Sequence, residues 1–252
     1  NVNSLDTRRA FIRASATIGT GLFLSACGRS DSAQAVKQTG ESSSQKDEKE
    51  EGSEVTATED LMREHGVLRR ALLVYTAAAN PLRANPASVP PDALQKTAKL
   101  FRAFGEDYHE KKLEEPYIFP AVKKAGGPAA SYPDILVVQH DCGREITDYI
   151  LSVTQGAKLG AANAEPLARA MDSLVLMYRN HAAREDTVVF PAWKKTLPEK
   201  ELHEMGEKFE EIEHQQFGEG GFENAVKQIG EIEGMLGLTD ISQFTAPPPP
   251  KA

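Results

Sequence analysis

The sequence predicts an all-α protein whose centre is built from two helical hairpins. Apolar residues recur at steps of three and four along several segments, which is the spacing of one buried helical face. One such stripe runs through Leu174 and Tyr178 and ends on His181 and Glu185. Residues four apart lie on one face of a helix, so this imidazole and this carboxylate could reach the same metal ion.

An internal repeat doubles this pair of candidate ligands. The segment YHEKKLEEPYIFPAVKK aligns with NHAAREDTVVFPAWKK, and both contain a Phe-Pro pair followed by two lysines. In the alignment His109 matches His181, and Glu114 matches Glu185. The earlier copy holds one extra residue, Leu113, between its histidine and its glutamate.

Two further histidines complete the set. His65 and His140 each lie on a stripe at helical spacing, and His65 precedes His109 by nearly the same distance as His140 precedes His181. Each hairpin therefore carries a histidine on its first helix, and a histidine and a glutamate on its second. Such a set exceeds the tetrahedral shell of zinc and suits a pair of iron ions better.

This arrangement resembles the hemerythrin-like family, whose HHE domain binds cations. The resemblance covers roughly residues 55–200 and includes both Phe-Pro helix ends. It implies an up-down four-helix bundle of hemerythrin type around two non-haem iron ions bridged by carboxylates. The implied metal ligands are His65, His109, Glu114, His140, His181 and Glu185.

Two departures from the family pattern concern the second hairpin. Oxygen-carrying members have another histidine four residues after that of the third helix, where this chain has Arg144. Arg144 shares a helical face with His140 but has no lone pair for a metal, so we expect a more open site with position 144 facing the metals. Asp186 has the spacing of the family's aspartate ligand, although we prefer Glu185 because it lies four residues after His181.

The third departure is the longer spacing in the first copy of the repeat. On a regular helix Glu114 would point about 140° away from the histidine five residues before it. A one-residue π-bulge would restore the shared face, and Pro116 favours such a bulge because it cannot donate to the carbonyl four residues earlier. This hypothesis makes Leu113 the looped-out residue, while Glu110 and Glu115 remain competing ligands that fit the Phe-Pro spacing less well.

Capping residues, glycines and prolines predict the helix boundaries. Thr58 is a plausible N-cap of the first helix, and Asn80-Pro81 marks its end. The four helices of the bundle are expected at about 58–79, 92–120, 132–155 and 165–190.

The stretch from Pro198 to Leu238 carries two more apolar stripes, which we expect to form helices that pack across the bundle. Their members are Leu202, Met205, Phe209 and Ile212, followed by Phe222, Ala225, Val226, Ile229 and Ile232. His203 and His214 lie off these stripes in Glu-rich surroundings, so we expect neither to bind metal. Residues 241–252 form a proline-rich tail.

Composition excludes some classes of partner and fold. The chain has 252 residues and a formal net charge of -8, and it lacks a basic patch beyond its first residues, which argues against nucleic acid. Its 2 cysteines imply no disulfide framework.

The N-terminal segment, residues 1–27, has the pattern of an export signal. TRRAFIR resembles a twin-arginine signal, and the apolar run after it is too short to span a membrane. The run ends in LSAC, which resembles a lipobox whose Cys27 becomes lipidated. Residues 28–54 are polar and are expected to form a disordered tether. We therefore expect a lipid-anchored periplasmic or extracytoplasmic protein, attached to the membrane through Cys27, with its bundle in residues 55–240.

The family resemblance and the ligand set favour a protein that binds or senses dioxygen, nitric oxide or peroxide outside the membrane. One alternative is a di-iron oxidase, peroxidase or nitric oxide reductase, which would need an external electron donor. Another is iron storage or delivery. No reductase, flavin or haem module is recognisable in the sequence, so a binding protein is preferred over an enzyme.

Overall fold

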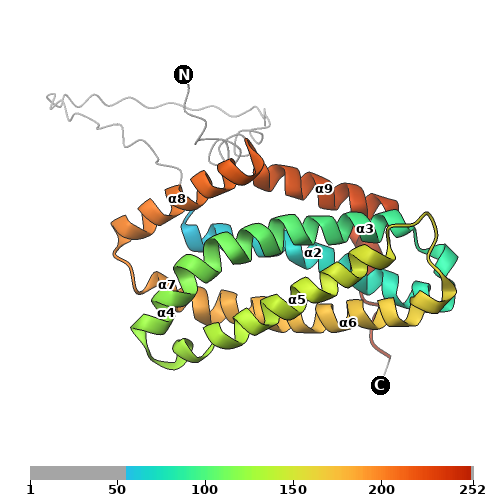
Figure 1. Cartoon of the computed structure of the whole chain (residues 1–252), viewed down its shortest axis with the longest axis horizontal. Coiled ribbons are helices and arrows are strands. Elements are labelled where there is room, and N and C mark those ends of the chain that lie inside the picture. The colour runs from blue at the N-terminus through green and yellow to red at the C-terminus, as the bar shows by residue number, and fades with distance from the viewer. Residues whose placement is uncertain (1–54, 251–252) are drawn as a thin grey trace, which may run out of the picture. The chain divides into compact units, whose positions relative to one another are not determined.

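The computed structural model describes residues 55–250, and this part of the chain is all-α, without a strand (Figure 1). The compact unit that holds the helices begins at Thr56. The expected export signal, lipobox and tether lie in residues 1–54, outside the described residues. None of the helices within 55–250 combines the length and hydropathy needed to cross a membrane.

Four long helical rods form the bundle, and two of them change from α- to π-helix and back. The first rod is α2 (Ala57–Ala84) and the third is α5 (Pro133–Val153). The second rod runs without a break through α3 (Pro91–Leu100), the π-helix η3 (Phe101–Ile118) and α4 (Phe119–Ala125). The fourth consists of α6 (Ala161–Arg184), the π-helix η5 (Glu185–Val189) and α7 (Phe190–Lys194). Short 3-10 turns lie at Pro86–Ser88 (η2), Pro128–Ser131 (η4) and Ile241–Phe244 (η6).

The start of α2 differs from the prediction by two residues. Thr56, rather than Thr58, is the N-cap: its hydroxyl accepts from the Glu59 backbone N–H, and the Glu59 carboxylate accepts from the Thr56 N–H. This reciprocal capping box satisfies two backbone donors that a helix start otherwise leaves unpaired. Thr58 is instead buried inside the helix. The helix also continues past Pro81, and the Asn85 N–H donates to the Pro81 carbonyl at 2.8 Å to close the last turn.

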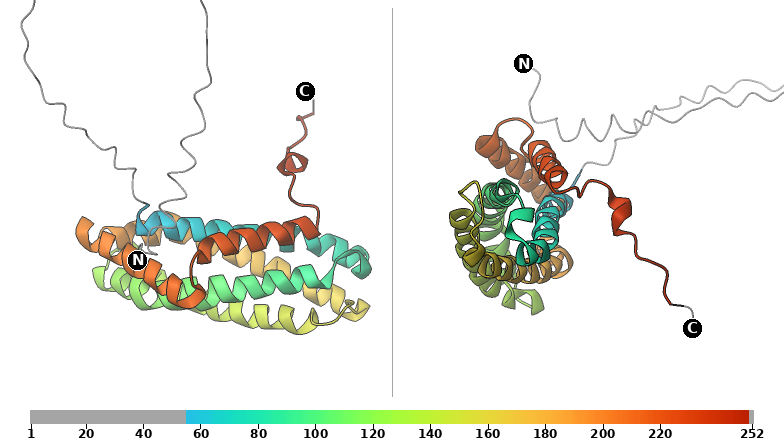
Figure 2. Two further views of the ribbon diagram at one scale, coloured as in Figure 1. Left: turned by 90° about the horizontal axis from the view of Figure 1, so that it is seen from above. Right: turned by 90° about the vertical axis from the view of Figure 1, so that its right-hand side faces the viewer.

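The bundle core lies where the predicted stripes meet. In the end-on view of Figure 2 the four rods surround a common interior. Leu61, Leu68, Phe101 and Leu174 are all buried there. Large buried side chains on either side of the histidines therefore exclude water from the middle of the bundle, which strengthens electrostatic interactions at that point.

The two C-terminal helices pack across the bundle, as the apolar stripes predict. They are α8 (Glu199–Phe217) and α9 (Gly221–Met235). The α9 helix contacts α2 and α3, and α8 contacts α2 and η3. The stripes supply the buried residues Leu202, Phe209, Ala225, Ile229 and Ile232. Gly218 and Gly220, with φ of 75° and 70°, form the sharp turn between α8 and α9 because glycine adopts positive φ without strain.

Candidate metal centre

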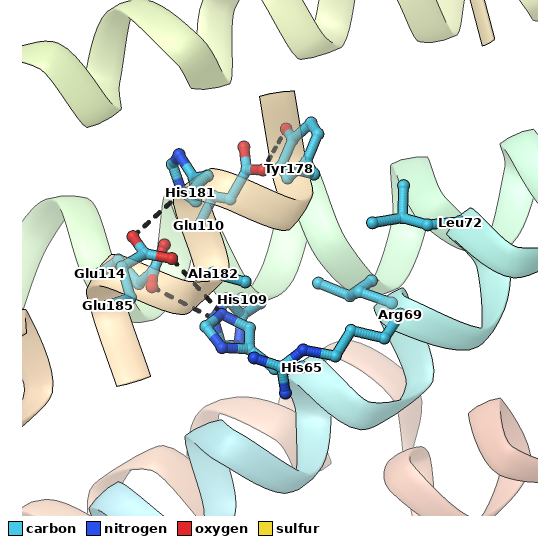
Figure 3. A pocket seen from close by; sticks show the side chains of 11 residues that line it. His65, Arg69, Leu72, His109, Glu110, Glu114, Tyr178, His181, Ala182 and Glu185 are labelled. Atoms are coloured by element: carbon cyan, nitrogen blue, oxygen red, sulfur yellow. Dashed lines mark hydrogen bonds and ion pairs between the residues drawn. The ribbon is translucent and has the colours of Figure 1, made fainter. Parts of the chain in front are cut away.

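The structure brings the six predicted ligand residues together inside the bundle, and Figure 3 shows all of them except His140. His65 comes from α2, His140 from α5 and His181 from α6, while the π-helices η3 and η5 supply the two glutamates. None of the six is more than 3% exposed. The surrounding helices therefore close over all six side chains.

The four imidazoles form two pairs. The Nε2 atoms of His65 and His109 lie 3.1 Å apart, and we name the space in front of them position 1. The Nε2 atoms of His140 and His181 also lie 3.1 Å apart, and the space in front of them is position 2. Each pair joins the two helical rods of one hairpin, so the sequence repeat produces two similar half-sites.

Both glutamates reach from one position to the other. Glu114 Oε1 lies 3.2 Å from His109 Nε2, and its Oε2 lies 3.4 Å from His140 Nε2. Glu185 Oε2 lies 3.5 Å from His65 Nε2, and its Oε1 lies 3.0 Å from His181 Nε2. Each carboxylate therefore offers one oxygen to position 1 and one to position 2, which is the arrangement of a bridging ligand.

The unpaired atoms of the site fit a bound cation. Glu114 Oε2 and both carboxylate oxygens of Glu185 are buried and accept no well-formed hydrogen bond from residues 55–250. A buried carboxylate is costly unless it is paired or coordinates a metal. Imidazole nitrogens and carboxylate oxygens together suit first-row transition metals. The residues present thus supply both the ligands and the negative charge that metal cations need.

The wide turns that carry the glutamates account for the irregular spacing in the repeat. The predicted π-type turn is confirmed, although it extends over Phe101–Ile118 rather than over one bulged residue. The N–H of Phe119 donates to the Glu114 carbonyl five residues earlier, and the N–H of Phe190 donates to the Glu185 carbonyl in the same way. Leu113 is not looped out. It is 1% exposed and packs in the core, because the extra residue is absorbed by the wider winding of the whole segment.

Asp186 lies on the Nδ1 side of the His65 ring, away from the two metal positions. The Nδ1 of His65 and Asp186 Oδ1 lie 2.7 Å apart, and Arg69 pairs with the other oxygen of Asp186. Burial raises the pKa of Asp186, but the hydrogen bonds from His65 and Arg69 bring it below its usual value. Asp186 therefore orients the ring of His65, and Glu185 is the residue that faces both positions.

The second hairpin repeats this arrangement around His140. Its Nδ1 lies 2.9 Å from Glu115 Oε1, and Arg144 pairs with Glu115 and, at 3.2 Å, with Glu110. The hydrogen bond from His140 lowers the pKa of Glu115 to about 2, against burial and with help from Arg144. The expectation that position 144 faces the metals is wrong, because the guanidinium lies behind His140 and pairs with carboxylates there. Glu110 and Glu115 likewise lie behind the ligand layer.

The rings of His109 and His181 are oriented by Glu64 and Gln139, which directly precede His65 and His140 in the sequence. The Nδ1 of His109 lies 2.7 Å from Glu64 Oε2, and the Nδ1 of His181 lies 2.9 Å from Gln139 Oε1. With an acceptor at each Nδ1, the network assigns the proton to Nδ1 and turns the Nε2 lone pair towards the centre. Burial lowers the pKa of His109, but the carboxylates of Glu114 and Glu64 outweigh it and raise the value well above the ordinary range.

Sequence reasoning missed these supporting residues, although the repeat contains their signal. Glu64 and Arg69 flank the first histidine in the pattern EHxxxR, and Gln139 and Arg144 flank the third in QHxxxR. Alignment of the first helices of the two hairpins identifies the pair Glu64 and Arg69 and the pair Gln139 and Arg144.

A small cavity adjoins the ligands (Figure 3). It measures about 10 Å³, close to the room that a single water-sized molecule needs. Leu68, Leu72 and Ala182 line its apolar side. Tyr178, which lies on the apolar stripe of its helix, also forms a hydrogen bond: its hydroxyl donates to Glu110 Oε1 at 2.6 Å. Burial and Glu110 raise the pKa of Tyr178 well above its ordinary value, so its hydroxyl remains a donor.

Gly143 makes room for this tyrosine. A Cβ atom at position 143 would lie 2.3 Å from the Tyr178 hydroxyl oxygen, far inside any normal contact. His203 and His214, which were not expected to bind metal, are exposed on α8, and Cys142 is exposed on α5.

Comparison with known proteins places the chain in a family. The family model of the hemerythrin HHE cation-binding domain matches residues 56–193. Uncharacterized proteins of Mycobacterium tuberculosis and Mycobacterium bovis are 45% identical to the chain over 195 residues, which is 76% of this chain and 74% of each relative. No solved structure matches the chain. From the family match and the 45% identical relatives, this chain belongs to the hemerythrin HHE cation-binding domain family.

Proposed function

We propose that the protein binds two iron ions at positions 1 and 2 and uses them to bind or sense a small diatomic molecule or peroxide. The observation that carries this proposal is that Glu114 and Glu185 each direct one oxygen to each position. Four imidazoles shared equally between two positions leave each ion with nitrogen and oxygen ligands, a mixture that suits iron. Bound ferrous ions would supply electrons and open coordination positions for dioxygen, nitric oxide or peroxide.

The size and lining of the cavity support a small ligand. Its volume of about 10 Å³, the room of a single water-sized molecule, suits a very small ligand better than an organic substrate. Leu68 and Leu72 keep one side apolar, whereas the Tyr178 hydroxyl and the ligand residues make the other side polar. Deep burial of all six ligands favours retention of the ions over iron delivery, because delivery requires easy exchange with solvent.

We also propose that the domain works outside the membrane as a lipoprotein. The twin-arginine pattern TRRAFIR and the motif LSAC, which ends on Cys27, support this location. The twin-arginine route exports folded proteins, so a bundle loaded with iron in the cytoplasm could pass through it intact.

Anaerobic reconstitution of the metal-free protein with ferrous iron tests the proposed centre. We expect about two iron ions per chain, as the paired ligand set requires. His140→Ala should lower this stoichiometry, whereas His203→Ala, which changes an exposed histidine on α8, should leave it unchanged. A single bound ion, or a preference for zinc, would contradict the proposal. Absorption spectra before and after air then separate a binder from an enzyme: reversal under vacuum indicates binding, and steady consumption of oxidant with an electron donor indicates turnover.

A further inference from the structure

The two metal positions have similar surroundings, so the differences between the residues that support their histidines are informative. At position 1 the His65 ring is held by Asp186, which pairs with an arginine. At position 2 the His140 ring is held by Glu115, which also pairs with an arginine. Each of these two supports is a carboxylate accompanied by a guanidinium. At position 2 the arginine also pairs with the buried Glu110, whose Oε2 lies 3.8 Å from His140 Nδ1.

The remaining support differs between the positions. The His109 ring of position 1 donates to a carboxylate, Glu64, which is only 1% exposed. The His181 ring of position 2 donates instead to the neutral amide of Gln139, which is partly buried. Glu64 and Gln139 occupy matching places in the repeat, directly before the first-helix histidine. The acceptor of the second histidine ring, a carboxylate at position 1 and a neutral amide at position 2, therefore distinguishes the two positions.

Tyr108 of η3 holds Glu64 in place and connects it to the C-terminal helices. The Tyr108 hydroxyl donates to Glu64 Oε1 at 3.0 Å and lies 3.4 Å from Glu213 Oε2 of α8. Glu213 Oε1 accepts from the backbone N–H of Phe222, at the start of α9, at 3.0 Å. A Cβ at Gly221 would lie 2.8 Å from the Glu213 side chain, so glycine permits this close approach. The chain of contacts runs from α9 through α8 to His109, although α8 and α9 lie beyond the residues that the family model matches.

The physical effect of this difference has a definite direction. A carboxylate that accepts the Nδ1 proton makes the imidazole a stronger electron donor to a metal on Nε2 and fixes the orientation of the ring. Glu110 places a buried carboxylate near His140 as well, so the difference between the positions rests on the hydrogen bond and not on the number of charges. A neutral amide fixes the ring of His181 but does not increase its electron donation.

We propose that position 1 binds its metal ion more tightly than position 2 and fills first, and that Glu64 causes this inequality. The inference rests on the proposed pair of metal ions. Glu64 acts through His109 and is a positioning residue, not a ligand, and Tyr108 and Glu213 extend its support into the C-terminal helices.

Anaerobic titration of the metal-free protein with ferrous iron, in competition with a chelator, tests the proposal. The wild-type protein should show two affinities. Glu64→Gln should weaken the tighter one about 10- to 100-fold, the usual effect of losing such a support, and leave the weaker one almost unchanged. The matched variant Gln139→Glu should tighten the weaker one. Substitution of His65 should abolish binding of the tighter ferrous ion, and substitution of His140 should abolish binding of the weaker one.

Each other outcome has a clear meaning. Two equal affinities in the wild-type protein, or an effect of Glu64→Gln on the weaker equivalent alone, would overturn the inference but leave the metal pair intact. A total of one ion would instead overturn the proposed function. Tyr108→Phe and Glu213→Gln should weaken the tighter equivalent selectively. Equal weakening of both equivalents by these two variants, with a lowered melting temperature, would show a merely structural role for the C-terminal helices.

Discussion

Adjacent acidic residues have different roles in this candidate metal centre. Glu114 directs its carboxylate oxygens at His109 Nε2 and His140 Nε2, whereas Glu115 accepts from the Nδ1 of His140. The same division separates Glu185 from Asp186 in the second copy of the repeat. Successive residues of a helix point in different directions, so a pair of adjacent acids can supply one bridge and one support.

This division predicts different results for two adjacent substitutions. Glu114→Ala should lose the iron pair, because it removes one oxygen from each position. Glu115→Ala should retain the iron, with an affinity for the ion at position 2 about 10- to 100-fold lower, because only the support of His140 is lost. Metal analysis after gel filtration measures both. If Glu115→Ala lost the pair and Glu114→Ala kept it, the assignment of bridge and support would have to be exchanged.

At the scale of the helices, α5 and α6 make a tight contact where a glycine faces a tyrosine. Gly143 on α5 leaves the space that the Tyr178 ring of α6 occupies, and the hydroxyl then reaches Glu110 of η3. Three helices therefore meet at one contact beside the small cavity. A side chain at position 143 would push the tyrosine away from its acceptor.

Two glycine substitutions test this contact. Gly143→Ala should destabilise the fold by about 1–3 kcal/mol, the usual cost of overpacking a tight core. Gly66→Ala is the matched control, because it lies inside α2 and a Cβ there meets nothing within 4 Å. It should stabilise the protein by up to about 1 kcal/mol through better helix propensity. Chemical denaturation gives both values, and equal effects of the two substitutions would refute the close contact.

For the whole molecule, the proposed lipid anchor concerns where the bundle resides. The compact unit begins at Thr56, and the proposed lipidation site is Cys27. We propose that lipidation of Cys27 attaches the protein to the membrane.

Replacing each cysteine in turn tests the anchor. Cys27→Ser should move the protein from the membrane fraction to the soluble fraction, because the modified thiol is lost. Cys142→Ser should leave it in the membrane fraction, since Cys142 is an exposed residue of α5. Cell fractionation with labelling by a radioactive or alkyne-tagged fatty acid measures both. A wild-type protein that is soluble and carries no lipid would rule out the anchor.

Much of the site was predictable because the ligands lie on faces defined by local spacing. Steps of three and four residues identify the inward face of each helix, and the repeat shows which polar residues share it. The irregular turn before Pro116 was also predictable, because Glu114 could not otherwise join its histidine. The burial of Leu113 was not, since the length of the π-helix depends on how the whole segment packs.

The sequence by itself determined the all-α fold and the six candidate metal-ligating residues, since periodicity and the repeat are local properties of the chain. Tertiary structure alone decided which acceptor holds each ring, that Arg144 lies behind the ligands, and that Glu213 of α8 reaches Tyr108. These contacts join helices far apart in sequence. Their pairing depends on the register and rotation of one rod against another, and spacing within a single helix does not encode either.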